Sequence, residues 1–230
     1  RVAGNPISGN GYSVHIGADA EWLIQPPRNL VTQAQTLTLS DRPELRIDPT
    51  TLISTGAIAN VSGAQVYGVE AAATYGPFIA QGEYYWFNVD RTANTGLPPV
   101  GATSLKFDGG YAQVGYVLTG ESRAYNAANA AYGGIKPANP FSLAGGGWGA
   151  WEIAGRVSQM NLNDQLATAA GIAGGRQTIY TAALNWYVNN NVRFMLDYLH
   201  GEISKQASAT SAVNTGSSFN AVAMRTQVAF

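Results

Sequence analysis

YSVHIGADAEW, residues 12–22, alternates apolar and polar side chains without interruption. The apolar set is Tyr12, Val14, Ile16, Ala18, Ala20 and Trp22, and the polar or small set is Ser13, His15, Gly17, Asp19 and Glu21. Successive side chains of a β-strand point to opposite faces of the sheet. The stretch therefore predicts a strand with one apolar face and one polar face.

The same alternation recurs along the chain and predicts about nine strands. They are expected at 12–23, 67–75, 78–86, 110–118, 151–158, 177–186, 192–198 and 222–230, with a weaker strand at 32–40. The apolar faces end in aromatic side chains such as Trp22, Tyr75, Trp86, Trp186 and Phe230. Aromatic residues gather in this way where strands of a transmembrane β-barrel meet the membrane interface.

Composition excludes several classes of protein. Charged residues make up 12% of the chain, against about 25% in an ordinary soluble domain. No window approaches the roughly 18 uninterrupted apolar residues of a membrane helix. The net charge of -1 and the lack of a basic run argue against a nucleic-acid partner. A soluble β-sandwich remains the alternative, but its strands are typically about five or six residues long.

The connections alternate in length, which independently favours a barrel. Gly76-Pro77 and Asn189-Asn190 resemble tight periplasmic turns, whereas 92–104, 161–174 and 205–218 resemble longer external loops. Counting back from a last strand that ends in the periplasm gives 12–23 the same direction as that last strand and places Arg1 at the external end. Complete bacterial barrels have an even strand number and periplasmic termini. We therefore expect residues 1–230 to be the C-terminal part of one β-barrel domain whose upstream strands are missing.

Several stretches in the second half together form a specific pattern. They are Tyr67-Gly-Val-Glu-Ala71, Ala80-Gln-Gly-Glu-Tyr84, Tyr116-Val-Leu-Thr-Gly-Glu121, Ile135-Lys-Pro137, Gly149-Ala-Trp-Glu152, Leu184-Asn-Trp-Tyr187 and the terminal Phe230. Over 64–230 the chain resembles the phosphate-selective porin O/P family of Gram-negative outer membranes. The resemblance implies an all-β transmembrane antiparallel barrel of roughly 16 strands, a homotrimer, contact with the lipid bilayer and lipopolysaccharide, and diffusion of small anions, notably phosphate, or other hydrophilic solutes.

The resemblance also implies a lumen narrowed by inward-folded segments that carry Arg and Lys. Arg46, within 41–63, falls where family members place basic residues on an inward-folded loop, and 122–147 resembles a periplasmic-side segment tucked into the lumen. Arg46 and Lys136 are therefore the expected constriction residues. Asn126 stands where phosphate-selective members tend to carry Lys. This departure from their pattern argues against phosphate specificity.

The alternation of side chains along each strand assigns further charges to the lumen wall, where a narrow pore selects ions. The acidic candidates are Asp19, Glu21, Glu70, Glu83, Glu152 and Asp197, and the basic candidates are Arg156, Arg193 and Arg225. The arginines could form a ladder of permanently charged donors for oxyanions. Alternatively they pair with carboxylates across strands and keep the wall polar and rigid. Glu152 and Arg156 are about 13 Å apart along one strand, so each is expected to pair across strands.

Catalytic and metal sites are not expected. His15 and His200 lack a neighbouring histidine, cysteine or carboxylate pair at ligand spacing, and no Gly-x-Ser-x-Gly motif is present. The sequence therefore predicts an outer-membrane porin that is a passive channel, without a cofactor and not an enzyme. An outer-membrane barrel enzyme or an adhesin with a sealed lumen is the alternative.

Overall fold

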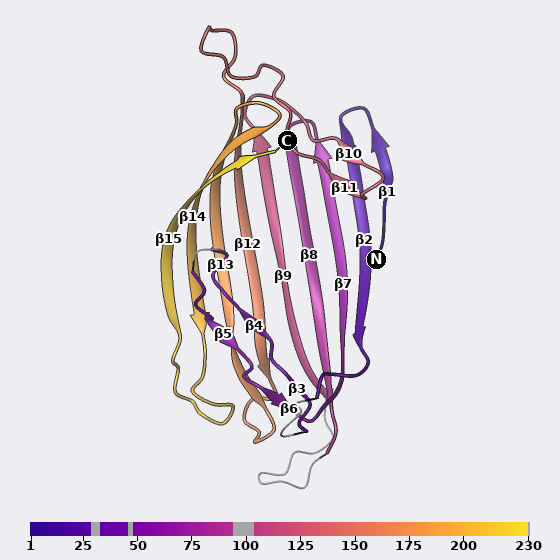
Figure 1. Ribbon diagram of the computed structural model, residues 1–230, viewed down its shortest axis with the longest axis vertical. Helices are drawn as coiled ribbons and strands as arrows, with labels where there is room; N and C mark the ends of the chain where they lie inside the picture. Colours follow the sequence, from indigo (N-terminus) through magenta and orange to yellow (C-terminus); the bar gives the residue numbers. More distant parts are fainter. Residues whose placement is uncertain (29–32, 46–47, 94–103, 230) are drawn as a thin grey trace.

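The computed structural model describes residues 1–28, 33–45, 48–93 and 104–229. Within these residues the chain forms a nine-stranded antiparallel sheet in which each long strand lies beside the next long strand of the sequence (Figure 1). Its members, in order, are β1 (Val2–Gly9), β2 (Tyr12–Leu23), β7 (Val61–Tyr75), β8 (Phe78–Arg91), β9 (Ser104–Val117), β12 (Ala150–Asp164), β13 (Ile172–Tyr187), β14 (Val192–Ser204) and β15 (Ser217–Val228). The part of the chain that is described contains no helix long and apolar enough to cross a membrane.

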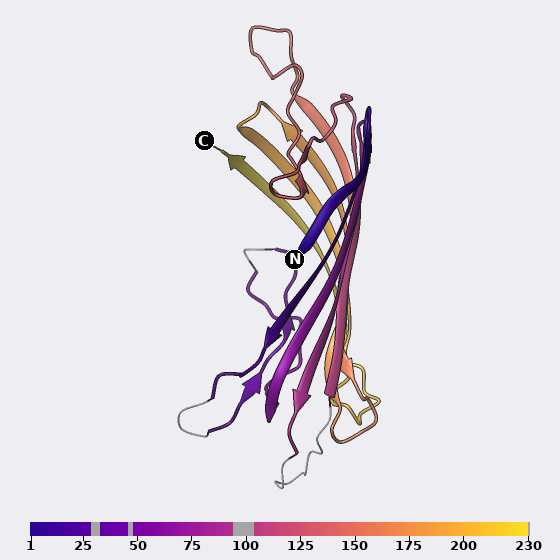
Figure 2. The same cartoon turned by 90° about the vertical axis from the view of Figure 1, so that its right-hand side faces the viewer.

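The sheet is bent into a trough, and two long connections lie against its concave side (Figure 2). In the described residues β1 and β15 are the two edges of the sheet and do not pair with each other, so the sheet is not a closed barrel. Six two-residue strands form three separate two-stranded sheets in the long connections. These are β3 (Thr36–Leu37), β4 (Ser40–Asp41), β5 (Ile53–Ser54), β6 (Ile58–Ala59), β10 (Tyr125–Asn126) and β11 (Ala131–Tyr132).

The alternation seen in the sequence becomes the two faces of the sheet. In β2 the polar-set residues Ser13 and His15 are 9% and 5% exposed, whereas the apolar-set Ile16 is 52% exposed. The convex face carries exposed large apolar side chains on every long strand of the sheet. Examples are Tyr67, Tyr75, Phe78, Trp86, Tyr116, Ile153, Leu184, Leu196 and Met224. The eight long strands other than β1 are 12 to 16 residues long, longer than the roughly 9–11 residues that cross a bilayer on a tilt.

One predicted strand is wrong and one strand escaped prediction. The segment 32–40 does not join the main sheet, because its described residues form only β3 and the start of β4. The ninth strand is β1, whose Asn5-Pro6 lies where the register with β2 shifts between Gly4 and Ile7. A proline cannot donate a ladder hydrogen bond and is tolerated at an edge or bulge. That irregularity hides the strand from a search for strict alternation.

Because β1 and not 32–40 is the ninth strand of the sheet, one predicted strand direction changes. β2 pairs directly with β7, with Tyr12 opposite Tyr75, so the strand at 12–23 runs opposite to β15 and the prediction of a shared direction is wrong. β1 takes the direction of β15 instead. The predicted number of nine strands was therefore correct, but one of them was assigned to the wrong segment.

The two ends of the sheet differ in their connections. The turns Asn10-Gly11, Gly76-Pro77 and 188–191 lie at one end, uppermost in Figure 1, as predicted for the two that the sequence identified. The 118–149 segment lies at this same end, which we call the short-turn end. The 24–60 connection leaves β2 and enters β7 at the opposite end, where 165–171 and 205–216 also lie. The loop expected at 161–174 is shorter because β12 continues to Asp164, and most of the loop expected at 92–104 lies outside the described residues.

The main apolar core lies between the sheet and the 24–60 segment. Ile53 and Ile58 of this segment are 0% and 1% exposed and pack with Val89, Phe107 and Leu162 of three long strands. Burial of such side chains stabilises by about 1.5–3 kcal/mol each. This apolar contact fixes the 24–60 segment on the concave side, where it can shape the space inside the trough.

Candidate functional site

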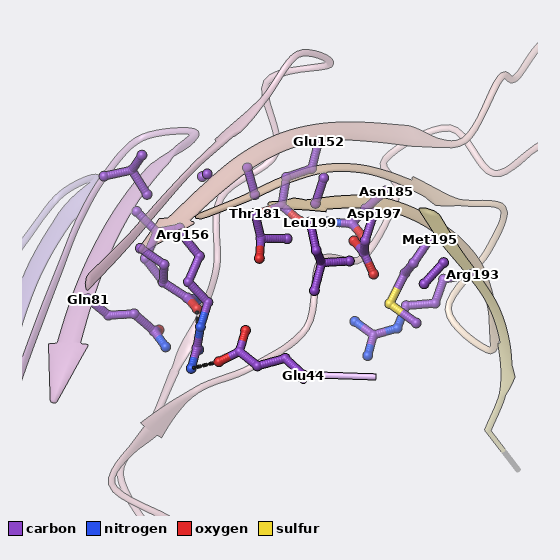
Figure 3. A pocket seen from close by; sticks show the side chains of 18 of the residues that line it. Glu44, Gln81, Glu152, Arg156, Thr181, Asn185, Arg193, Met195, Asp197 and Leu199 are labelled. Carbon is purple, nitrogen blue, oxygen red and sulfur yellow. Dashed lines mark hydrogen bonds and ion pairs between the residues drawn. The ribbon is translucent and has the colours of Figure 1, made fainter. Parts of the chain in front are cut away.

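The concave face holds a cavity of about 640 Å³ between the two long segments (Figure 3). The 24–60 segment contributes Glu44 and Leu45 from one end, and the 118–149 segment contributes Arg123 and Tyr132 from the other. The strands supply a largely polar wall. Its members include Gln81, Gln113, Glu152, Arg156, Thr181, Asn185, Arg193, Met195 and Asp197.

Arg156 of β12 connects the wall to the 24–60 segment. Its Nη2 lies 3.1 Å from Oε1 of Glu44, and its Nη1 donates to Oε1 of Gln113 at 3.3 Å. The guanidinium also lies 3.9 Å from the ring centroid of Tyr111, within the range of a cation–π interaction. The charge of Arg156 is therefore shared with a carboxylate that reaches it across the cavity, and is not offered to the cavity alone.

A second ion pair fixes the 118–149 segment to the wall. Glu152 is 2% exposed, and its carboxylate accepts hydrogen bonds from Arg123 Nη2 at 2.7 Å, Tyr187 Oη at 2.7 Å and Asn185 Nδ2 at 3.1 Å. Burial lowers the pKa of Arg123, but the adjacent Glu152 carboxylate more than offsets this and leaves that pKa above its usual value. The pair is buried and hydrogen-bonded, so it acts as an anchor for the segment.

A third cluster joins β2, β7 and the β10–β11 hairpin. Glu70 Oε1 lies 3.1 Å from His15 Nε2 and 2.5 Å from Arg1 Nη2. The other ring nitrogen of His15 is 2.9 Å from Tyr125 Oη, and Tyr132 Oη is 2.6 Å from Ser13 Oγ. These contacts place the first half of the 118–149 segment against the concave face of β2 and β7.

Comparisons with known proteins agree with this architecture. The family described as "Phosphate-selective porin O and P" matches residues 1–230. The chain belongs to this family. An uncharacterised protein of Caulobacter vibrioides is 36% identical over 187 residues, which are 80% of this chain and 33% of that protein. Porin O of Pseudomonas aeruginosa is 31% identical over 144 residues, which are 61% of this chain and 30% of that protein.

Membership of the porin O/P family confirms the resemblance inferred from the sequence and extends it from 64–230 to the whole chain. The alignments cover only about a third of the length of either relative. Within the described residues no group of three or more His, Cys, Asp or Glu side chains could hold a metal ion.

The structure places the predicted wall residues of this porin-family chain in different surroundings. Glu152, Arg156, Arg193 and Asp197 line the cavity. Arg193 donates to Gln227 Oε1 from Nε at 3.1 Å and from Nη2 at 2.7 Å, and in the described part of the chain no hydrogen bond or ion pair holds the Asp197 carboxylate. Among the described residues, Arg193 therefore bonds to a neutral amide and has no carboxylate partner at the cavity wall.

The remaining predicted residues that the structure describes do not line this cavity. Glu83 faces the concave side and accepts hydrogen bonds of 2.7 Å from Tyr85 Oη and Tyr111 Oη. Arg225 is exposed on β15, opposite Met195 in the register. Lys136 is exposed on the 118–149 segment, and Arg46 lies outside the described residues. Of the two expected constriction residues, the structure therefore describes only Lys136, which is not part of the cavity wall.

Sequence reasoning missed Glu44 and Arg123, the two partners that decide the charge of the cavity. Each lies in a long connection without alternation, so no periodic pattern identifies the face it occupies. Arg156 and Arg123 do not pair with carboxylates of neighbouring positions in the chain, since their partners are 112 and 29 residues away. The cross-strand hydrogen bond from Arg156 to Gln113 and the bond from Arg193 to Gln227 do join opposite residues of paired strands.

Proposed function

We propose that this chain is part of the wall of an outer-membrane porin, a water-filled channel through which small hydrophilic solutes diffuse passively. The observation that carries the proposal is the division of one long-stranded sheet into an apolar convex face and a polar concave face. A soluble sheet would bury its apolar face against a second layer. A transmembrane barrel instead turns that face to lipid and its polar face to water.

Closure of the barrel is part of the same proposal. The edges β1 and β15 have no partner strand among the described residues, and an open sheet edge is not tolerated in the hydrocarbon of a bilayer. We therefore assign residues 1–230 to the C-terminal part of one barrel domain of roughly 16 strands. The homotrimer and the contact with lipopolysaccharide implied by the family resemblance belong to this proposal as well.

The cavity charges favour weak selectivity over strict specificity for phosphate. Arg156 is paired with Glu44, and Arg123 with Glu152. Arg193 and Asp197 then leave one charge of each sign at the wall of the cavity. Arg193 and Asp197 are four residues apart on β14, about 13 Å at roughly 3.3 Å per residue, and each charge is screened beyond about 8–10 Å in physiological salt. Because neither sign dominates the wall, solutes are sorted mainly by size and polarity, with anions such as phosphate among those admitted.

The decisive experiment is the reversal potential of the reconstituted protein in a planar bilayer under a KCl gradient, repeated with phosphate on one side. The proposal expects stepwise conductance with a small reversal potential and partial, weak block by phosphate. Strong anion bias with phosphate block would show an oxyanion-selective pore in which Arg46 and Lys136 act at the constriction. Absence of conductance in protein that has inserted into the bilayer would reject the channel and favour a sealed barrel.

A further inference from the structure

Residues 138–149 form a projecting loop at the short-turn end, the salmon-coloured loop above β12 in Figure 1. We call it the aromatic lobe. It contains Phe141, Leu143 and Trp148 but no charged side chain. Leu143 and Trp148 are 95% and 77% exposed. Exposed large apolar side chains that cluster on one projection indicate a surface that another phase or molecule covers.

The aromatic lobe is attached to the convex face and not to the cavity. Trp186 Nε1 donates a hydrogen bond of 2.8 Å to the carbonyl oxygen of Trp148, and the Phe141 ring meets Trp186 edge-on at 5.4 Å between centroids. Trp186 in turn stacks on Trp151 and Phe194, with centroids 5.3 and 5.6 Å apart. The lobe therefore continues a convex-face aromatic cluster beyond the ends of β12, β13 and β14.

Backbone hydrogen bonds give the lobe a defined shape. Phe141 N donates to Val188 O at 2.8 Å, and Gly149 N donates to Asn139 O at 3.0 Å, which closes the base of the loop. At the tip, Gly145 and Gly146 have φ values of 94° and 103°, a region that L side chains rarely adopt. The sharp turn at these glycines keeps Leu143 and Trp148 on the outside of the loop.

We propose that the aromatic lobe is an interfacial anchor, with Trp148 and Leu143 inserted in the headgroup region of the membrane leaflet at the short-turn end. The inference rests on the proposed function, because it requires the convex face to lie in lipid. Trp residues favour the membrane–water interface. The lobe is uncharged and continuous with the lipid-facing aromatic cluster, and these two properties favour lipid over an aqueous protein partner.

The opposite end of the sheet provides a contrast. The 205–216 connection is also long, but its one exposed large apolar residue is Val213, and it has no aromatic side chain. Of these two long connections, only the 118–149 segment carries an exposed aromatic side chain, Trp148. The lobe would fix the height of the barrel in the membrane. It lies where the 118–149 segment passes from the concave face to the convex face.

The lack of cysteine in the chain allows a direct test with single labels. Leu143→Cys, and Asn190→Cys as a control in the neighbouring polar turn, are each labelled with an environment-sensitive fluorophore and reconstituted in phospholipid vesicles. Both positions are exposed, so neither change removes a packed side chain. The proposal expects blue-shifted emission at position 143 that spin-labelled lipids quench, whereas the label at position 190 is quenched by aqueous iodide.

Three other outcomes would overturn the anchor. Quenching at position 143 by iodide as strong as at position 190 would place the lobe in water. Protection from both quenchers would place it against protein, such as a second copy of the chain. Equal lipid quenching at both positions would mean that the whole end is immersed and that the lobe has no special role. Conductance of the same labelled protein separates this inference from the proposed function: a conducting pore with a water-exposed lobe rejects the anchor alone.

Discussion

The 24–60 and 118–149 segments reach the concave face from opposite ends of the sheet, and they are held there by different forces. The 24–60 segment is held mainly by apolar burial, with Ile53 and Ile58 in the core. The 118–149 segment is held by a buried ion pair between Arg123 and Glu152 and by tyrosine hydroxyl groups. Apolar burial is non-directional, whereas a buried ion pair requires one geometry. The two anchors should therefore fail in different ways.

The largest effect is expected from Glu152→Gln, which leaves Arg123 as a buried charge without its counter-charge. Loss of one partner of a buried ion pair costs about 3–5 kcal/mol. Hydrogen exchange should show the backbone of 123–135 released while the 24–60 segment stays protected. Glu202→Gln, at an exposed glutamate on β14, is the matched control. Unchanged exchange in 123–135 would mean that Tyr125 and Tyr132 suffice to hold the segment.

A somewhat smaller effect is expected from Ile53→Ala. The side chain is fully buried, and removal of such a group costs about 2–5 kcal/mol including the cavity that it leaves. Limited proteolysis and hydrogen exchange should show the described residues of the 24–60 segment opening while 123–135 stays protected. Val213→Ala, at an exposed position, should leave both segments unchanged. Simultaneous release of both segments would show that they are coupled through the cavity.

Glu44→Gln should change ion selectivity more than stability. The Arg156–Glu44 pair is about one-third exposed on each side chain, and such pairs contribute only about 0–1 kcal/mol. In a conducting porin the freed guanidinium should shift the reversal potential under a KCl gradient toward anion selectivity. Glu202→Gln again serves as the control. A shift toward cations, or none, would show that Arg156 does not face the ion path.

The smallest effect concerns Asp41, whose carboxylate accepts a hydrogen bond of 3.0 Å from Gln177 Nε2. Burial raises the pKa of Asp41, so the folded state binds its proton more tightly than the unfolded chain does. The stabilising contribution of protonated Asp41 to the packing of the 24–60 segment is therefore fully present below the unfolded pKa. It is lost as pH rises through the folded pKa. The hydrogen-exchange protection factor of 36–41, which is corrected for the intrinsic pH dependence of exchange, should fall over that interval in the parent protein and stay constant in Asp41→Asn. A pH dependence that persists in the variant would assign it to another group.

The candidate site was only partly predictable from the sequence. Parity placed Glu152, Arg156, Arg193 and Asp197 on one face because a strand alternates its side chains by local geometry alone. It could not supply Glu44 or Arg123, which lie in connections where no periodicity sets the direction of a side chain. Strand β1 was missed for a related reason, since Asn5-Pro6 and the register shift interrupt its pattern.

The sequence by itself determined the all-β class, the positions of eight of the nine long strands and the polar and apolar faces of the sheet. Each of these follows from the two-residue period of a strand, which needs no information from elsewhere in the chain. Only the tertiary structure decided the path of the 24–60 segment, the direct pairing of β2 with β7 and the partners of Arg156 and Glu152. These depend on contacts between residues far apart in the chain, such as Glu44 and Arg156 at a separation of 112 residues, and folding alone brings such residues together.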